Sequence, residues 1–204
     1  AELLYFPATG QPLPPYDPPE QTQCRRQFNL CAVDDAGICM DCVNDMLRSR
    51  EMELIDLERY RSYVDIPIIR FYEHIFDLKK VPFDTIVREF TQSYIRYENR
   101  VKLMQGAVSA LDSVCRAGIP QIILSAANTA EINRLLSRFG LEKYFSAVLG
   151  ASDFRAESKT ERAEAFFGSN DNGRKLVIGD TTHDWETAEA LKGECILFSG
   201  GHQN

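Results

Sequence analysis

The chain has 204 residues, 44% hydrophobic and 26% charged, which is typical of one globular domain or of a core with a small insertion. Its formal net charge of -7 argues against a general nucleic-acid groove, because such grooves need a basic field to displace counterions. The sequence has no apolar run long enough to cross a bilayer and no signal-peptide pattern at its start. We therefore expect a cytoplasmic protein that contacts neither nucleic acid nor membrane, and its oligomeric state stays open.

The beginning of the chain is rich in proline, since six of the nine prolines lie in residues 1–20. Consecutive prolines favour extended polyproline backbone and remove hydrogen-bond donors. We expect residues 1–23 to form a tail or arm on the surface, and a ligand for a proline-binding domain is the less favoured alternative.

Four of the six cysteines lie close together, at Cys24, Cys31, Cys39 and Cys42, and the last two form a C-x-x-C pair. A zinc site would usually need a second pair or histidines at ligand spacing, and neither is nearby. A redox pair at a helix start after a strand is an alternative. We favour free cysteines that pack as small apolar residues in a reducing compartment.

A strand and then a helical region are predicted up to about residue 103. The apolar run Phe28–Asp34, followed by acid and glycine, predicts the first strand. From Val43 to about Val101 apolar residues recur at helical spacing, and Pro67 and Pro82 divide this region into three or four helices. The many aromatic residues here indicate the core of a small helical subdomain.

After residue 104 the pattern changes to strands that alternate with helices. The predicted elements are a helix over Ala107–Ala117 closed by Gly118, a strand over Ile119–Leu124, a helix over Thr129–Phe139 with Gly140 as its C-cap, a strand over Phe145–Leu149, a helix over Lys159–Phe167, a strand over Lys175–Ile178, a helix over Trp185–Leu191 and a strand over Cys195–Phe198. Such alternation predicts a parallel sheet with right-handed crossovers, whose ligands bind beyond the carboxyl ends of the strands.

Polar and charged side chains follow these predicted strands, at Asp34, Ser125, Lys159, Asp180 and Asp184. The last two acids can hold Mg²⁺, because a hard cation needs oxygen ligands, or they can form an acidic cap on the next helix. A carboxylate nucleophile, a hydroxyl, a cation and a metal-binding acid pair are together what phosphoryl transfer needs.

These residues resemble the haloacid dehalogenase superfamily of hydrolases over about residues 27–204, and most closely its phosphoglycolate-phosphatase-like branch. The matching segments are Leu103–Ala107, Ile123–Ala127, Ser158–Thr160 and Gly179–Asp184. The resemblance implies a Rossmann-like α/β core, with a parallel sheet, over residues 24–42 and 104–204. It also implies an inserted helical cap over residues 43–103, which would close the site and select the substrate.

The resemblance implies residue roles as well. Asp34 would be the nucleophile, and Ser125, Ala126 and Lys159 would bind the phosphate of a small phosphorylated metabolite, with Lys159 also acting in catalysis. Mg²⁺ would be held by Asp34, Asp180 and Asp184, and by the backbone carbonyl of residue 36.

The first motif departs from the family pattern of an acid, any residue, a second acid, glycine and threonine. In the register that starts at Asp34, Ala36 replaces the acid/base and Ile38 replaces the threonine. The other register leaves Val33 as the nucleophile, which is worse. We do not expect Asp35 to replace the missing acid, because neighbouring strand residues face opposite ways. A positioned general acid–base contributes roughly 10²–10⁴-fold to the rate.

Three interpretations of this motif stay open beside an ordinary turn, which its acids and glycine would also suit. We favour a weakened phosphatase, and the second is a catalytically silent homologue that binds or regulates. The third is a C–P hydrolase, because phosphonoacetaldehyde hydrolases also carry Ala at this position and use a cap lysine, here Lys79 or Lys80, although Ile38 and the surrounding cap sequence do not match that family.

The three histidines are weighed by their positions. We expect His183 to face solvent from the acidic loop and His74 to pack on a cap helix. His202 follows the last predicted strand, and a position near the site and an exposed tail position are equally favoured.

Overall fold

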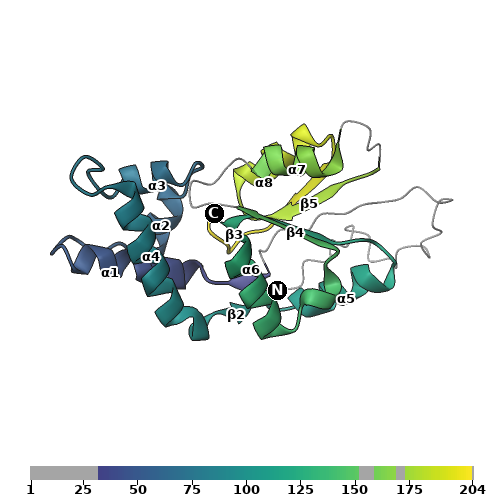
Figure 1. The fold of residues 1–204 in the computed structure, drawn as a ribbon, viewed down its shortest axis with the longest axis horizontal. Coiled ribbons are helices and arrows are strands. Elements are labelled where there is room, and N and C mark those ends of the chain that lie inside the picture. The colour runs from purple at the N-terminus through teal and green to yellow at the C-terminus, as the bar shows by residue number, and fades with distance from the viewer. Residues whose placement is uncertain (1–31, 152–158, 169–172, 204) are drawn as a thin grey trace, which may run out of the picture.

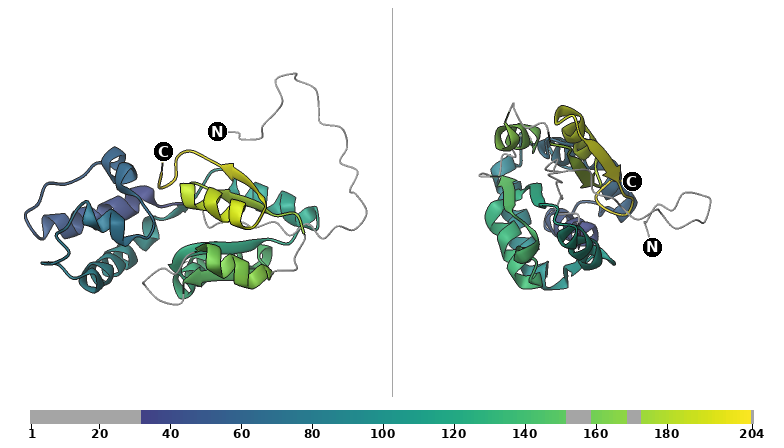
Figure 2. Two further views of the ribbon diagram at one scale, coloured as in Figure 1. Left: turned by 90° about the horizontal axis from the view of Figure 1, so that it is seen from above. Right: turned by 90° about the vertical axis from the view of Figure 1, so that its right-hand side faces the viewer.

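The computed structural model describes residues 32–151, 159–168 and 173–203. Figure 1 shows a group of helices at one end of the molecule and an α/β part at the other, and Figure 2 shows the same two parts from above. The proline-rich segment, Cys24, Cys31 and Ser158 lie outside the described residues.

The helical part contains α1 (Ala36–Arg48), α2 (Leu57–Tyr63), α3 (Ile69–Glu73), α4 (Phe83–Tyr97) and the 3-10 turn η1 (Glu98–Arg100). On α1, Cys39, Val43 and Met46 recur at helical spacing and pack into a buried cluster with Phe71 and Ile86. The predicted breaks are confirmed, because residue 67 lies between α2 and α3 and residue 82 is the N-cap of α4.

The α/β part contains five helical segments and the strands of three ladders. Its elements are β1 (Val33–Asp34), β2 (Lys102–Leu103), α5 (Ala107–Arg116), β3 (Ile122–Asn128), α6 (Thr129–Phe139), η2 (Glu142–Tyr144), β4 (Ala147–Ala151), α7 (Lys159–Phe167), β5 (Leu176–Gly179), α8 (Thr182–Ala190) and β6 (Glu194–Leu197). In the view of Figure 1, α7 and α8 lie above β3, β4 and β5, and α6 lies below these strands.

The predicted α/β class and its Rossmann-like architecture are confirmed. β3 pairs with β4 and β5 pairs with β6, both in parallel, whereas β1 pairs with β2 in antiparallel fashion. Within the described residues these ladders form three separate pairs rather than one continuous parallel sheet. Because the carboxyl ends of the parallel strands still point the same way, the site forms where the alternation of elements predicts it.

Several predicted boundaries agree with the structure, and two differ in a way that matters for the site. α6 and α7 have the predicted bounds, and Gly140 ends α6 with a left-handed φ of 66°. β3 continues through Ser125 to Asn128, with an irregular register after Leu124. α8 begins at Thr182 instead of Trp185, because the acidic loop contributes its own helix cap.

Helix α1 runs through the boundary predicted between core and cap at residues 42 and 43. The C-x-x-C pair therefore lies on this helix, and both cysteines are buried and free. Burial raises the pKa of the Cys39 thiol well above its usual range and that of Cys42 to about 12. Such thiols stay protonated and pack as small apolar groups.

Candidate functional site

A cavity of about 340 Å³ lies between the helical part and the carboxyl ends of the strands. Six residues predicted from the sequence line it: Asp34, Ala36, Ser125, Ala126, Lys159 and Asp180. They come from the end of β1, from the first residue of α1, from β3, from the first residue of α7 and from the position after β5. Segments far apart in the sequence thus meet here because each begins or ends at the same edge of the fold.

Asp34 and Asp35 both line this cavity, although they are neighbours in sequence. Asp34 ends β1 and is exposed, and its carboxylate has no hydrogen-bond or ion-pair partner among the described residues. Asp35 is the N-cap residue of α1, and it accepts hydrogen bonds from the Tyr94 hydroxyl at 2.8 Å and from Nε2 of His202 at 3.1 Å.

Strand alternation does not turn Asp35 away from the site, so the prediction made on that ground is wrong. The strand ends at Asp34, and the backbone of Asp35, with φ -131° and ψ 2°, already turns into the helix. Alternation of side chains applies only inside a strand, so it does not separate these two carboxylates.

Ala36 lines the cavity as the first residue of α1, and its side chain belongs to the apolar cluster around Phe71. A helical carbonyl points toward the C-terminal end of its helix, where it accepts from the fourth residue on. The backbone carbonyl of Ala36 as a metal ligand, as the resemblance implies, therefore stays a prediction.

The two acids of the Gly179–Asp184 segment have different surroundings. Asp180 lines the cavity, and its Oδ2 accepts a hydrogen bond from the backbone N–H of His202 at 2.5 Å. Gly201 packs directly against this carboxylate, where any side chain would overlap it. Asp184 does not line the cavity and is 1% exposed, because it closes a capping box with Thr181 at the start of α8.

The buried Asp184 forms an ion pair with Lys159, with 3.0 Å between its Oδ1 and Nζ. Burial raises the pKa of Asp184, but the charge of Lys159 and the hydrogen bonds from Thr181 outweigh it, so this pKa lies below its ordinary value. The structure thus gives Asp184 the capping position that the sequence left open. Direct metal ligation by Asp184 stays a prediction.

Ser125 lies where the register of β3 becomes irregular. Its Oγ accepts from the backbone N–H of Ala127 at 3.1 Å, and its carbonyl accepts from Arg162 of α7 at 2.8 Å. These bonds hold the Ser125–Ala126 segment at the cavity, which Lys159 also lines. A hydroxyl, backbone N–H groups and one ammonium group suit the oxygens of a phosphate.

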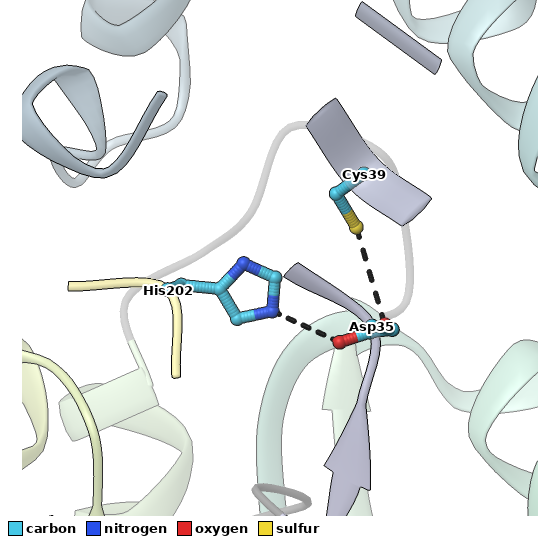
Figure 3. A group of neighbouring side chains, drawn as sticks. All are labelled: Asp35, Cys39 and His202. Atoms are coloured by element: carbon cyan, nitrogen blue, oxygen red, sulfur yellow. Dashed lines mark hydrogen bonds and ion pairs between the residues drawn. The ribbon is translucent and has the colours of Figure 1, made fainter. Parts of the chain in front are cut away.

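The sequence favoured two positions for His202 equally, one near the site and one in an exposed tail. In the structure, His202 lines the cavity. Nε2 bonds to Asp35 (Figure 3), and Nδ1 lies 3.0 Å from the Tyr60 hydroxyl. Burial lowers the pKa of His202, but the hydrogen bond and charge of Asp35 outweigh it and raise this pKa overall. The available signal was its position just past the carboxyl end of the last strand.

The segment around His202 joins the two parts of the molecule. Arg61 of α2 donates to the carbonyls of Gly200 and Gly201, both at 2.9 Å. Gln203 donates to the Val64 carbonyl and accepts from the backbone N–H of Thr182, both at 2.8 Å. Residues 200–203 thus hold the helical part in place over the strand ends.

Two other expectations about side chains need correction. His183 does not face solvent: it is buried in the first turn of α8, with Nδ1 3.1 Å from a Glu186 carboxylate oxygen. Lys79 and Lys80 are exposed, and neither lines the cavity. The C–P hydrolase interpretation, which needs one of these lysines in the site, thus has no support in the described residues.

Two groups of side chains here could hold a metal ion. Asp34 and Asp180 offer carboxylate oxygens, which suit Mg²⁺. Asp35, Cys39 and His202 offer mixed ligand atoms that all lie within 4.8 Å of one another (Figure 3). The hydrogen bonds of Asp35 with Tyr94 and His202 account for this second group without a metal.

The sequence of residues 31–198 matches the model of the haloacid dehalogenase-like hydrolases. The chain belongs to this family. The predicted resemblance is therefore confirmed, and residues of the matched segments line the cavity. No curated protein matches the chain.

Solved structures with the same fold include several phosphatases and hydrolases of this family. The chain is similar to a haloacid dehalogenase-like hydrolase from Streptococcus pneumoniae, with a TM-score of 0.77 and 15% identity, covering 90% of this chain and 88% of that one. It is similar to a predicted phosphatase from Clostridium acetobutylicum, with a TM-score of 0.74 and 19% identity over 90% and 88%. A predicted phosphoglycolate phosphatase from Haemophilus somnus gives a TM-score of 0.72 and 14% identity over 91% and 89%.

These identities are low, so the similarities establish the fold and leave the substrate to the site itself. Among the described helices, none has the length and apolar character needed to span a membrane.

Proposed function

We propose that this protein is a Mg²⁺-dependent phosphatase that hydrolyses a small phosphate monoester through a phosphorylated Asp34. The observation that carries the proposal concerns Asp34, whose carboxylate has no partner among the described residues. It lines the same cavity as Ser125, Lys159 and Asp180. Membership of a hydrolase family and the phosphatases of the same fold support this reaction class.

The chemistry follows from the positions of these groups. An Asp34 oxygen attacks phosphorus, the bond from phosphorus to the ester oxygen breaks, and the leaving group departs with that electron pair. Ser125, the backbone at Ala126 and Lys159 hold the phosphate oxygens that do not react. Water then attacks the phosphorus of the aspartyl phosphate, which releases phosphate and restores Asp34.

Mg²⁺ would be held by Asp34 and Asp180, and when bound it would neutralise the charge that develops on the phosphate oxygens. These residues fit Mg²⁺ because the carboxylates of Asp34 and Asp180 line the same cavity. Lys159 already pairs with Asp184, which positions its ammonium group at the cavity wall.

The missing acid at Ala36 limits the reaction. Asp35 and His202 also line the cavity, but they bond to each other and Asp35 accepts from Tyr94, so neither is assigned as the proton donor. Without such a donor, an alkyl ester must expel a strongly basic alkoxide, and the second step lacks a base for water. A positioned general acid–base contributes roughly 10²–10⁴-fold, so we expect turnover of alkyl phosphates to be lowered by about that factor.

A protein that binds a phosphorylated ligand without turnover is the second candidate. Ala36 favours it, and so does His202, whose backbone N–H bonds to Asp180 and whose ring bonds to Asp35. In this case the cavity would keep its phosphate and Mg²⁺ ligands, while the chemical step would be lost.

The deciding experiment measures phosphate release from aryl and alkyl monoesters, with Mg²⁺ and with a chelator. The proposal requires release that depends on Mg²⁺ and disappears in Asp34→Asn. If nothing is released, Mg²⁺ binding is followed separately by the melting temperature, which a bound ion raises by mass action. An increase that Asp180→Ala abolishes, and that Glu189→Ala on the exposed face of α8 keeps, would leave the binding function as the better account.

A further inference from the structure

The wall of the cavity formed by residues 43–103 is apolar and aromatic. Its lining includes Tyr60, Val64, Ile68, Phe71, Val87 and Phe90. No charged residue of this region lines the cavity among the described residues. The charged residues of the lining, Asp34, Asp35, Glu131, Lys159, Asp180 and His202, all come from the α/β part or its junction with α1.

The polar tips of two tyrosines in this wall are already bonded. The Tyr60 hydroxyl faces Nδ1 of His202 at 3.0 Å, and the Tyr94 hydroxyl donates to Asp35 at 2.8 Å. Both rings also pack with others, since Tyr60 meets Phe71 edge-on at 5.3 Å and Tyr94 stacks with Phe90 at 6.1 Å. What these side chains offer a ligand is therefore ring surface, which favours flat apolar groups.

From this wall we propose that the substrate is an aryl phosphate monoester, with its phosphate on the strand ends and its ring against the aromatic wall. This inference rests on the proposed function and specifies its substrate class. A cavity of about 340 Å³ is at the small end of the range of small-molecule sites, which suits a single ring with its phosphate.

The absent acid supports the same class by an independent argument. A phenol resembles the tyrosine side chain, whose pKa is about 10, so a phenolate leaves without being protonated far more easily than an alkoxide does. The position where the family carries its acid is occupied here by Ala36, which packs into the apolar cluster with Tyr60 and Phe71. The loss thus slows the first step far more for alkyl esters than for aryl esters, while the second step, which both classes share, is slowed equally.

Small phosphate esters with a carboxylate in their leaving group are disfavoured by the same wall. A second anionic group would be buried against apolar side chains without a cation to pair with, and unpaired buried charge is costly. Arg59 and Arg61 flank Tyr60 in the chain, and neither lines the cavity. Arg59 donates to the Tyr63 hydroxyl, and Arg61 donates to the carbonyls of Gly200 and Gly201.

Two non-hydrolysable probes separate the alternatives, because phenylphosphonate and phosphonoacetate share the phosphonate and differ in the attached group. Calorimetric titration of the full chain with Mg²⁺ should give phenylphosphonate at least about tenfold tighter binding. Equal affinities, a preference for phosphonoacetate, or binding of neither probe would each overturn the substrate class.

Val87→Lys assigns the preference to this wall, because it places a cation where α4 lines the cavity. The ratio of the two affinities should shift toward phosphonoacetate by at least about fivefold. Ile95→Lys is the matched control, since Ile95 lies on the same helix, is 54% exposed and does not line the cavity. If Val87→Lys does not fold, Thr91→Lys makes the same test from a polar lining position.

The outcomes also separate this inference from the proposed function. Preferential phenylphosphonate binding without turnover of phenyl phosphate would refute the phosphatase and keep the ligand class. Mg²⁺-dependent turnover of alkyl and carboxylated esters in preference to phenyl phosphate would keep the phosphatase and overturn the ligand class. If the ratio of the two affinities is unchanged in both Val87→Lys and Thr91→Lys, the aromatic wall does not determine the preference.

Discussion

The two sides of the cavity differ in composition and in how they are held together. The side from the α/β part consists of carboxylates, a hydroxyl and an ammonium group, held by the Lys159–Asp184 pair and by helix caps. The side from the helical part consists of rings and aliphatic groups that also form a hydrophobic core around Phe71.

This difference assigns separate tasks to the two sides. Charged groups at strand ends can act on the part of a substrate that all phosphate esters share. Under the proposed function, the apolar side would contact the part in which esters differ, so it would determine which ester binds. Ala36 lies where the two sides meet, and it belongs to the apolar cluster around Phe71.

The largest expected effect comes from removing the nucleophile on the charged side. Asp34→Asn should lower kcat for phenyl phosphate by about 10⁴-fold or more, because the aspartyl phosphate cannot form. The melting temperature should change little, since Asp34 is exposed and unpaired within the described residues.

Asp35→Asn is the matched control for this change. It keeps the size of the neighbouring side chain and alters the bonds with Tyr94 and His202, so we expect a smaller loss of activity. A loss equal to that of Asp34→Asn, or larger, would transfer the nucleophile to Asp35 and contradict the assigned register.

The next effect concerns the buried pair that supports the charged side. Lys159→Met should lower the free energy of unfolding by about 3–5 kcal/mol, because it leaves the Asp184 carboxylate buried without its partner. Chemical denaturation measures this change, with the exposed Lys102→Met as a control.

Lowering the pH should remove the stabilisation that the pair of Lys159 and Asp184 contributes to the folded protein. Because the pKa of Asp184 is lower in the folded protein than in the unfolded chain, its contribution is complete above the unfolded pKa of about 3.9 and is lost as the pH falls through the folded value. Acid stability that is identical in wild type and Lys159→Met would show that the pair contributes nothing.

A smaller effect is expected where the two sides meet. Ala36→Asp should lower the free energy of unfolding by about 1–3 kcal/mol, because it buries a carboxylate among apolar side chains. In the fraction that folds, activity on alkyl phosphates should rise more than activity on phenyl phosphate, since general-acid help in the first step matters most for a strongly basic leaving group.

Gly37→Asp supplies the control, because a side chain there would meet no neighbouring atom within 4 Å. It should change stability by less than about 0.5 kcal/mol and leave the preference between esters unaltered. An alkyl activity that stays unchanged in Ala36→Asp would mean that residue 36 cannot reach the leaving group.

The smallest effect concerns the contact of His202 with Asp35. The pKa of His202 is raised in the folded protein, so its contribution is present below the unfolded pKa of about 6.5 and disappears as the pH rises through the folded value. The contact lies partly in solvent, so its contribution should be about 1 kcal/mol or less. Unfolding measured between pH 5 and pH 9 should show this slope in wild type and not in His202→Gln.

Local sequence patterns were sufficient for the order of helices and strands and for most of the polar residues predicted to line the cavity. Apolar residues at helical spacing, followed by a glycine, predicted the bounds of α6 at Thr129–Phe139 correctly, because helix formation depends mainly on nearby residues. The polar residues Asp34, Lys159 and Asp180 could be found because each ends a strand, begins a helix or follows a strand, and Ser125 could be found because it follows the apolar run at the start of β3.

The tertiary structure determined what depends on partners distant in sequence. Whether Asp184 faces a metal or caps a helix depends on Thr181 and on Lys159, which is 25 residues away in the chain. His202 reaches Asp35 across 167 positions, and no local pattern contains that contact. Sequence periodicity identified apolar residues on the cap helices, but only packing decided which of them also line the cavity, because a helix face can cover a core and a ligand site at once.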